Sequence, residues 1–155
     1  MLVNADGLVS WFLVSSLSGT RLMSDTAALI RRYYDAFNAG DMKTMLGCLS
    51  DTVEHGINET GKDNGRDAFG RFMERMNHCY REHLTDVVVF TTSDPTRAAA
   101  EYVVNGTYLA TDTGLPPARG QKYVLPGGAF FSVKDGKITR VTNYYNLQDW
   151  LRQVQ

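Results

Sequence analysis

Residues 32–41 read Arg32-Tyr33-Tyr34-Asp35-Ala36-Phe37-Asn38-Ala39-Gly40-Asp41. The stretch combines a helical repeat with a stop signal. Its apolar side chains, with one just upstream, recur at steps of three and four residues, the spacing of one buried helix face: Ile30, Tyr33, Tyr34 and Phe37. Asn38-Ala39-Gly40 is typical of a helix end, because glycine adopts the left-handed conformation at low cost. The sequence therefore predicts a helix that Ser24 or Asp25 caps at its start and that ends at Asn38.

A second short helix follows at once. Asp41 can cap it, and its apolar residues are Met42, Met45, Leu46 and Leu49. Two helices in a hairpin thus open the domain. Further on, the sequence predicts a short strand over residues 52–57, a polar loop over 58–65, and a third helix from Arg66 to Glu82 that would be the longest of the three.

From Leu84 the repeat changes to that of strands. We expect strands over residues 84–92, 97–111, 121–133 and 137–146, and a short closing helix at 147–151. A run of strands after a run of helices indicates an α+β fold with an antiparallel sheet rather than alternating βαβ units.

Residues 1–22 differ from the rest, since Gly7 to Leu17 are largely apolar and no Lys or Arg occurs before Arg21. Asp6 stands where a secretory leader carries positive charge, and the apolar run is shorter than the ~20 residues of a membrane span. We therefore divide the chain into a non-catalytic extension (1–22) and one domain (23–155). The extension could be an extra helix packed on the domain or an upstream start ahead of Met23, and export is the minority alternative.

Composition excludes several classes of protein. The chain has 155 residues, of which 43% are hydrophobic and 21% charged, with a net charge of -1. These values argue against disorder and against a nucleic-acid binder that works through a general positive field. Cys48 and Cys79 form no CxxC pair and have no His at ligand spacing, so we expect two buried thiols in a reducing, cytoplasmic compartment. Neither a metal, a cofactor nor a membrane partner is indicated.

Several phrases together carry a family resemblance. Besides residues 32–41 they are Asp51-Thr52-Val53-Glu54, Phe131-Ser132-Val133-Lys134-Asp135-Gly136-Lys137-Ile138 and Asn143-Tyr144-Tyr145-Asn146. Over residues 24–154 the chain resembles the nuclear transport factor 2-like superfamily, and within it the SnoaL-like polyketide cyclases and the ketosteroid isomerases. The resemblance implies a cone-shaped α+β barrel, also called cystatin-like. In it, a curved antiparallel sheet wraps around a helical hairpin and one long helix and encloses one apolar pocket. It also implies a homodimer through the outer sheet face.

The resemblance also assigns candidate catalytic positions. Ketosteroid isomerase uses a carboxylate base, a tyrosine and a protonated aspartate at the enolate oxygen. The tyrosine falls on Tyr33, which could equally be a core aromatic. The base falls on His55, whose imidazole can accept a proton near neutral pH or can simply be hydrogen-bonded at the strand end. A shift of one residue would move this position to Glu54 or Gly56.

The second acid falls on Ala129, which carries no carboxylate. The chain therefore lacks an acid that both the isomerases and the cyclases of the family use. Other polar side chains could rebuild a site. Asn58 lies with Glu59 on the loop after His55, and four more residues lie on strands expected to line the cone, so we predict a substrate-binding set of Asn58, Tyr108, Tyr123, Asn143 and Tyr145. His78 and His83 are expected at the surface.

Three functions stay open. The favoured one is a cofactor-free acid/base enzyme, of isomerase, cyclase or lyase type, acting on an apolar carbonyl-bearing small molecule, with His55 as base and Tyr33 as donor to the oxyanion. The second is a non-catalytic domain that binds such a molecule. The third is a dimeric scaffold whose cone is filled by side chains. The missing acid at position 129 favours the second or third.

Overall fold

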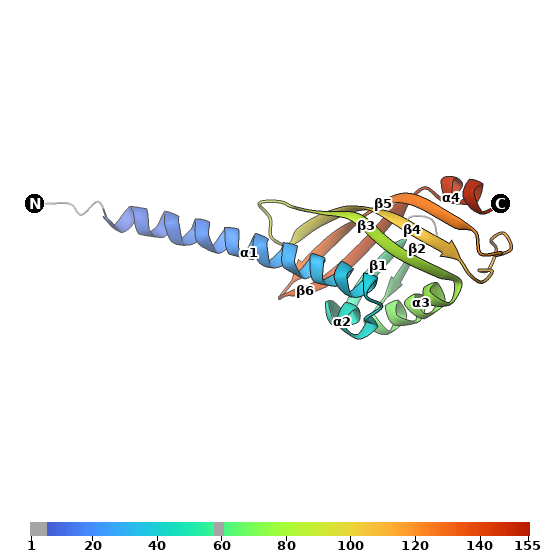
Figure 1. The fold of residues 1–155 in the computed structure, drawn as a ribbon. Coiled ribbons are helices and arrows are strands. Elements are labelled where there is room, and N and C mark those ends of the chain that lie inside the picture. Colours follow the sequence, from blue (N-terminus) through green and yellow to red (C-terminus); the bar gives the residue numbers. More distant parts are fainter. Residues whose placement is uncertain (1–5, 58–60) are drawn as a thin grey trace, which may run out of the picture.

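The computed structural model describes the backbone of residues 6–57 and 61–155, and the side chains of 19, 21, 22, 25–57 and 61–155. Its elements, in chain order, are α1 (Asp6–Asn38), α2 (Met42–Gly47), β1 (Leu49–Ile57), β2 (Gly61–Asn64), α3 (Arg66–Cys79), β3 (Tyr80–Thr91), β4 (Arg97–Tyr108), β5 (Lys122–Lys134), β6 (Lys137–Tyr145) and α4 (Leu147–Val154) (Figure 1). The part of the chain so described contains no helix long and apolar enough to cross a membrane.

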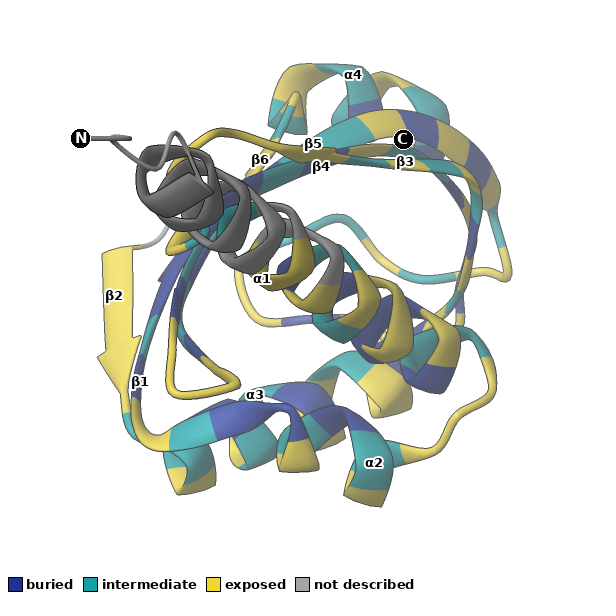
Figure 2. Ribbon diagram, turned by 90° about the vertical axis from the view of Figure 1, so that its left-hand side faces the viewer, coloured by how far each residue is buried: buried dark blue, intermediate teal, exposed yellow. Residues whose placement is uncertain are grey.

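The strands form one curved sheet in the order β2-β1-β6-β5-β4-β3. Neighbours pair antiparallel except β1 and β6, which pair in parallel. The antiparallel sheet that the sequence predicts is therefore a mixed one. A parallel pair needs a long crossover, and here α3 and the strands β3 to β5 provide it. The sheet wraps around the C-terminal half of α1, while α2 and α3 close the opposite side (Figure 2). The result is the predicted cone-shaped α+β fold.

The first helix is longer than the sequence predicts. It starts at Asp6 and runs through Ser24 and Asp25 without a break, so the predicted start at these residues is wrong. Cap residues stop a helix only where the preceding chain cannot continue it, and no proline precedes them. The N-terminal half of α1 projects away from the sheet instead of packing on the domain (Figure 1). Its end at Asn38, the φ of +67° at Gly40 and the Asp41 cap of α2 confirm the predicted hairpin.

The third helix ends three residues earlier than predicted. It stops at Cys79, and Tyr80 already begins β3, so α1 and not α3 is the longest helix. Tyr80 and Leu84 are buried while Arg81 and His83 are exposed. This pattern of apolar and polar residues fits the start of a strand as well as the end of a helix, so the sequence alone did not distinguish the two. Two shorter differences concern β1 and the polar loop. Leu49 belongs to β1 rather than to α2, and residues 61–64 fold back as β2 instead of forming loop.

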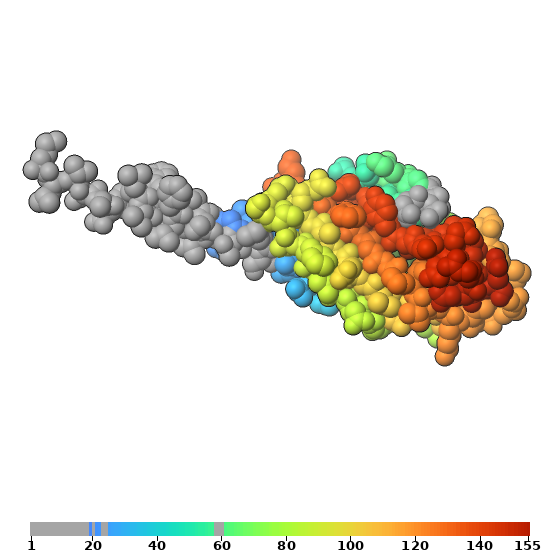
Figure 3. Space-filling view, turned by 90° about the horizontal axis from the view of Figure 1, so that it is seen from above, coloured from blue at the N-terminus to red at the C-terminus, as the bar shows by residue number. Residues whose placement is uncertain are grey.

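The end of α1 is tied to the open edge of the sheet. The Asn38 side chain accepts a hydrogen bond from the Leu84 backbone N–H (2.8 Å) and donates one to the Leu84 carbonyl (2.9 Å). The amide thus acts like a further strand at the edge strand β3 and satisfies backbone groups that would otherwise lack partners. Two strands away, α4 covers β5 (Figure 3), where Gln153 bonds both backbone groups of Val124.

One row of paired residues runs across strands β3, β4 and β5, and its middle residue is a glycine. Glu82 of β3 pairs with Gly106 of β4, and Gly106 pairs with Tyr123 of β5. A Cβ atom on Gly106 would lie 2.1 Å from the Tyr123 ring, so the ring occupies the space that any side chain at position 106 would need. Gly127 of β5 leaves room for a ring in the same way, since a Cβ there would lie 2.9 Å from the Tyr102 ring.

Gly106→Ala should therefore lower the free energy of unfolding by about 1–3 kcal/mol or more, because the added methyl group displaces the Tyr123 ring. The matched control is Gly70→Ala in α3, where a Cβ meets only Leu46 at 3.6 Å. Removing a helix-interior glycine should raise the free energy of unfolding by about 0.5–1 kcal/mol. Urea denaturation of both variants measures this, and equal effects would contradict the overlap at Gly106.

Candidate functional site

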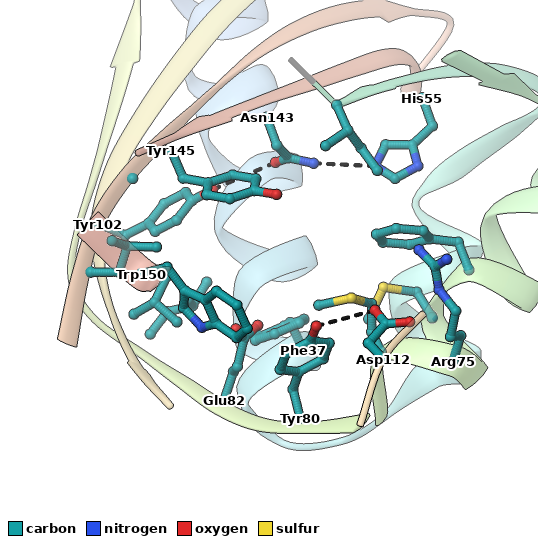
Figure 4. A pocket seen from close by; sticks show the side chains of 18 of the residues that line it. Phe37, His55, Arg75, Tyr80, Glu82, Tyr102, Asp112, Asn143, Tyr145 and Trp150 are labelled. Atoms are coloured by element: carbon teal, nitrogen blue, oxygen red, sulfur yellow. Dashed lines mark hydrogen bonds between the residues drawn. The ribbon is translucent and has the colours of Figure 1, made fainter. Parts of the chain in front are cut away.

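A cavity of about 330 Å³ lies between α1, α3 and the concave face of the sheet (Figure 4). Most of its wall is aromatic or aliphatic, with contributions from every helix and from β1 and β3 to β6. A few polar side chains interrupt this apolar wall. Five of the residues predicted as catalytic or substrate-binding lie on it: Tyr33, His55, Tyr123, Asn143 and Tyr145.

His55 lies inside the molecule on β1 with 1% of its surface exposed. Its imidazole packs between two rings of α3, with centroid distances of 4.3 Å to Phe69 and 4.7 Å to Phe72. The neighbouring Glu54 points the other way and forms an ion pair with Lys62 (3.0 Å). Of the three positions considered for the base, only His55 lines the cavity.

A chain of hydrogen bonds orients this histidine. Asn143 of β6 places Nδ2 3.2 Å from His55 Nε2, and its Oδ1 accepts from the Tyr102 hydroxyl (3.5 Å). The roles in this pair depend on the tautomer of the ring. Nε2 accepts when the amide N–H faces it, and Nε2–H donates when the amide is turned over so that its oxygen faces the ring, which leaves the lone pair on Nδ1. Nδ1 is buried and has no hydrogen-bond partner among the described residues. The imidazole is thus held in place through one nitrogen only.

Burial sets the charge of His55. Removal from water lowers the pKa of His55 from its usual 6.5 to about 4, and the attraction of Asp63 opposes this only weakly. The ring is therefore neutral at pH 7 and can accept a proton. The near-neutral titration expected from the sequence does not hold, because an unperturbed pKa describes an imidazole in water.

Tyr33 is both a core aromatic and a cavity residue. Its ring meets those of Tyr34 and Phe131 edge-on, at centroid distances of 5.2 Å and 6.1 Å. Burial raises the pKa of the Tyr33 hydroxyl well above its usual value of 10, so the hydroxyl stays a neutral hydrogen-bond donor. The two roles considered for this residue are thus compatible.

One residue of the predicted set lies elsewhere. Tyr108 does not line the cavity; it is fully buried behind the wall, stacked on Tyr80 at 5.2 Å, and its hydroxyl accepts from the Asp112 N–H (2.8 Å). Its place at the end of β4, against Trp150, makes it a packing residue. Asn58 lies outside the described residues. Ala129 is buried beside Asn143 in the β5 and β6 register, with no carboxyl group.

Sequence reasoning missed three polar residues of the wall. Glu82 accepts a hydrogen bond from the Tyr123 hydroxyl (2.5 Å), Asp112 accepts one from the Tyr80 hydroxyl (3.1 Å), and Tyr102 belongs to the His55 chain. Burial raises the pKa of Glu82, although the Tyr123 hydrogen bond opposes this. The signal for Glu82 was the alternation of Tyr80, Glu82 and Leu84, which share one side of a strand. A helix extended to Glu82 concealed it.

Comparisons with known proteins agree with this geometry. The model of the SnoaL-like domain family matches residues 30–141. Two putative polyketide cyclases of solved structure are similar to the chain. The protein from Pseudomonas putida KT2440 is 56% identical over 84% of this chain and 98% of its own, with a TM-score of 0.83. The protein from Silicibacter sp. TM1040 is 60% identical over 86% and 95%, with a TM-score of 0.81.

A more distant structure extends the comparison to the wider fold. A nuclear transport factor 2-like protein from Burkholderia xenovorans LB400 is 13% identical over 85% of this chain and 97% of its own, with a TM-score of 0.68. At this identity the likeness shows the fold alone. The search of curated proteins found no match.

The low pKa of His55 predicts a pH-dependent stability. Between the pKa in the unfolded chain, about 6.5, and the folded value, about 4, only the unfolded chain binds this proton, so the free energy of unfolding falls as pH falls through that window. The loss due to His55 should approach about 3 kcal/mol between about pH 7 and pH 4. His55→Gln, whose amide does not titrate, should lack this part of the slope. Urea denaturation at several pH values tests this prediction. If the free energy of unfolding changes with pH in the same way in both proteins, His55 is not a buried neutral imidazole.

Proposed function

The chain belongs to the SnoaL-like domain family, and from that premise we propose that it is an acid/base enzyme of the cyclase or isomerase kind, acting without a cofactor on an apolar, carbonyl-bearing small molecule. The observation that carries the proposal is His55, a buried and neutral imidazole held by Asn143 at the wall of an apolar cavity. A base in such a place meets a hydrocarbon skeleton without competition from water.

The proposed reaction begins with proton transfer from carbon. His55 acts in the tautomer whose Nε2–H donates to the Asn143 amide oxygen, so that Nδ1, which has no other partner among the described residues, takes a proton from the carbon next to the substrate carbonyl. The electron pair of that C–H bond forms the double bond of an enolate. The negative charge moves to the carbonyl oxygen, where the Tyr33 hydroxyl donates a hydrogen bond to it. The enolate then takes up a proton at another carbon, which gives an isomer, or attacks an electrophilic carbon of the same molecule, which closes a ring.

The charges of the two side chains support these roles. His55 is in its basic form at any pH well above 4, and Tyr33 keeps its hydrogen. Because Tyr33 is neutral before the reaction, its hydrogen bond strengthens when the oxygen becomes negative, which favours the transition state over the ground state. The buried position of both residues keeps their orientation fixed.

A binding domain without catalysis is the second candidate. Ala129 supports it, because the position that resembles the family's second acid has no acid. A scaffold with a filled cone is disfavoured by a cavity of about 330 Å³. The two remaining candidates agree on the ligand, an apolar small molecule, and differ in whether the cavity moves a proton.

Exchange of carbon-bound hydrogen tests the proposal. With the ketone 2-tetralone in D₂O, the wild-type protein should accelerate deuterium uptake next to the carbonyl, as followed by NMR. His55→Gln should lower the rate constant by about 10²–10⁴-fold, and Tyr33→Phe by about 10²–10³-fold. The rate should be level above about pH 5 and fall towards pH 4 as His55 is protonated.

Matched controls are available at the surface. His83→Gln and Tyr144→Phe make the same chemical changes at exposed side chains and should leave the rate unchanged. Circular dichroism and thermal melting of each variant confirm the fold. An unchanged rate in His55→Gln would overturn the assignment of the base. Saturable binding of 2-tetralone with no exchange in the wild type would favour the binding domain.

A further inference from the structure

We propose that Glu82 is a second catalytic carboxyl group of this cavity, held in place by Tyr123 across Gly106, and that it gives or takes the proton at the end of the substrate opposite His55. The role in the carbonyl reaction rests on the proposed function. The presence of a reactive carboxyl group in the cavity does not, and it can be tested separately.

The sheet register builds the position of this carboxyl group. Glu82, Gly106 and Tyr123 form one rung of β3, β4 and β5. Because Gly106 has no side chain, the Tyr123 ring lies across it and its hydroxyl reaches Glu82 Oε1 at 2.5 Å, two strands away. This hydrogen bond engages one of the two carboxyl oxygens. Trp150 of α4 packs edge-on against Tyr123 at 6.0 Å and fixes the ring from the other side.

Glu82 and His55 lie at opposite sides of the cavity (Figure 4). A ligand that fills the space between them can touch both. A single base can remove a proton, but isomerisation also requires that a proton be delivered at a second carbon, and ring closure requires that the acceptor oxygen be protonated. The arrangement offers one group for each of these two tasks.

Glu82 has no cationic partner among the described residues, and Arg75 of α3, which also lines the cavity, lies over the Phe72 ring. Tyr123 faces it from β5 and Tyr102 from β4, and Tyr80 on β3 is bonded to the further carboxyl group of Asp112. Among the described residues, no Lys or Arg forms an ion pair with Glu82, and the neighbouring Arg81 is exposed on the other side of β3. Burial therefore raises the pKa of Glu82, so the group keeps its proton to a higher pH than a surface glutamate.

The proposed step conserves atoms and charge. After His55 has taken the proton from carbon, the Glu82 carboxylic acid gives its own proton to the substrate and becomes a carboxylate, which the Tyr123 hydroxyl stabilises. The enolate is consumed, and the extra proton on His55 balances the charge on Glu82. Water returns both groups to their starting forms when the product leaves. In the reverse direction the same carboxylate acts as a base, so its base activity reports on the same group.

The test uses 5-nitrobenzisoxazole, a compact apolar probe of bases in apolar cavities. A carboxylate takes the hydrogen on its C3, the C–H electron pair forms a nitrile, and the N–O bond breaks to give a coloured phenolate. Wild-type protein should accelerate this reaction with a pH midpoint above about 4.3, the usual pKa of a glutamate. Glu82→Gln should lower the rate constant by at least about 10²-fold.

Further variants separate catalysis from structure. Tyr123→Phe removes a donor that stabilises the carboxylate, so it should move the pH midpoint of the reaction upwards, an effect that a merely structural residue would not produce. Glu101→Gln, the same change at an exposed glutamate of β4, should keep the wild-type rate and midpoint.

Each outcome decides between the alternatives. Wild-type rates in a folded Glu82→Gln variant, or no acceleration by the wild type, would overturn the role of Glu82. If Asp112→Asn loses the activity and Glu82→Gln keeps it, the base is Asp112, and the role of Glu82 is overturned too. If the probe reaction depends on Glu82 while 2-tetralone shows no exchange, the carbonyl reaction fails and the catalytic carboxyl group stands.

Discussion

The packing of α1 against the curved sheet is the contact on which the site depends. Tyr34 meets the Tyr102 ring at 5.4 Å and the Phe131 ring at 6.0 Å, and so sets the distance between the helix and strands β4 and β5. Protein interiors are otherwise packed as densely as organic crystals, so a cavity survives only where the surrounding elements cannot move together. Three features keep the elements apart here. They are the large aromatic rings of α1, the hydrogen bonds from Asn38 to β3, and the packing of α3 along one side of the cavity.

The polar groups of the cavity come in pairs that join separate strands or loops. His55 with Asn143 joins β1 to β6, and Glu82 with Tyr123 joins β3 to β5. A buried polar group without a partner is costly, so each pair offsets part of the cost of placing its members in an apolar wall. The same hydrogen bonds restrict the side-chain torsions. Stability and orientation of the site thus have one origin, and a variant of either partner affects both.

The sequence predicts the local features and misses those that depend on register. The helical hairpin, the late strands and the inward-facing His55 follow from periodicity, capping and family phrases near each residue. Glu82 could not be placed, because the pattern around it fits a helix end and a strand start equally well, and its partner Tyr123 lies two strands away across a glycine. The parallel pairing of β1 with β6 has no local signal either. The start of α1 was misplaced because a cap residue alone does not prove that a helix begins.

The apolar lining does more than receive an apolar ligand, because it also sets the charge of both proton-transfer groups. Burial disfavours charge on any side chain, so it lowers the pKa of His55 to about 4 and raises the pKa of Glu82. Between these two values the histidine is an unprotonated base and the glutamate a protonated acid. In water, at a pH between their ordinary pKa values, the same residues would have the opposite protonation states, with a charged imidazolium and a carboxylate. A cavity that filled with water would thus lose its base and its acid together, even if every side chain kept its position.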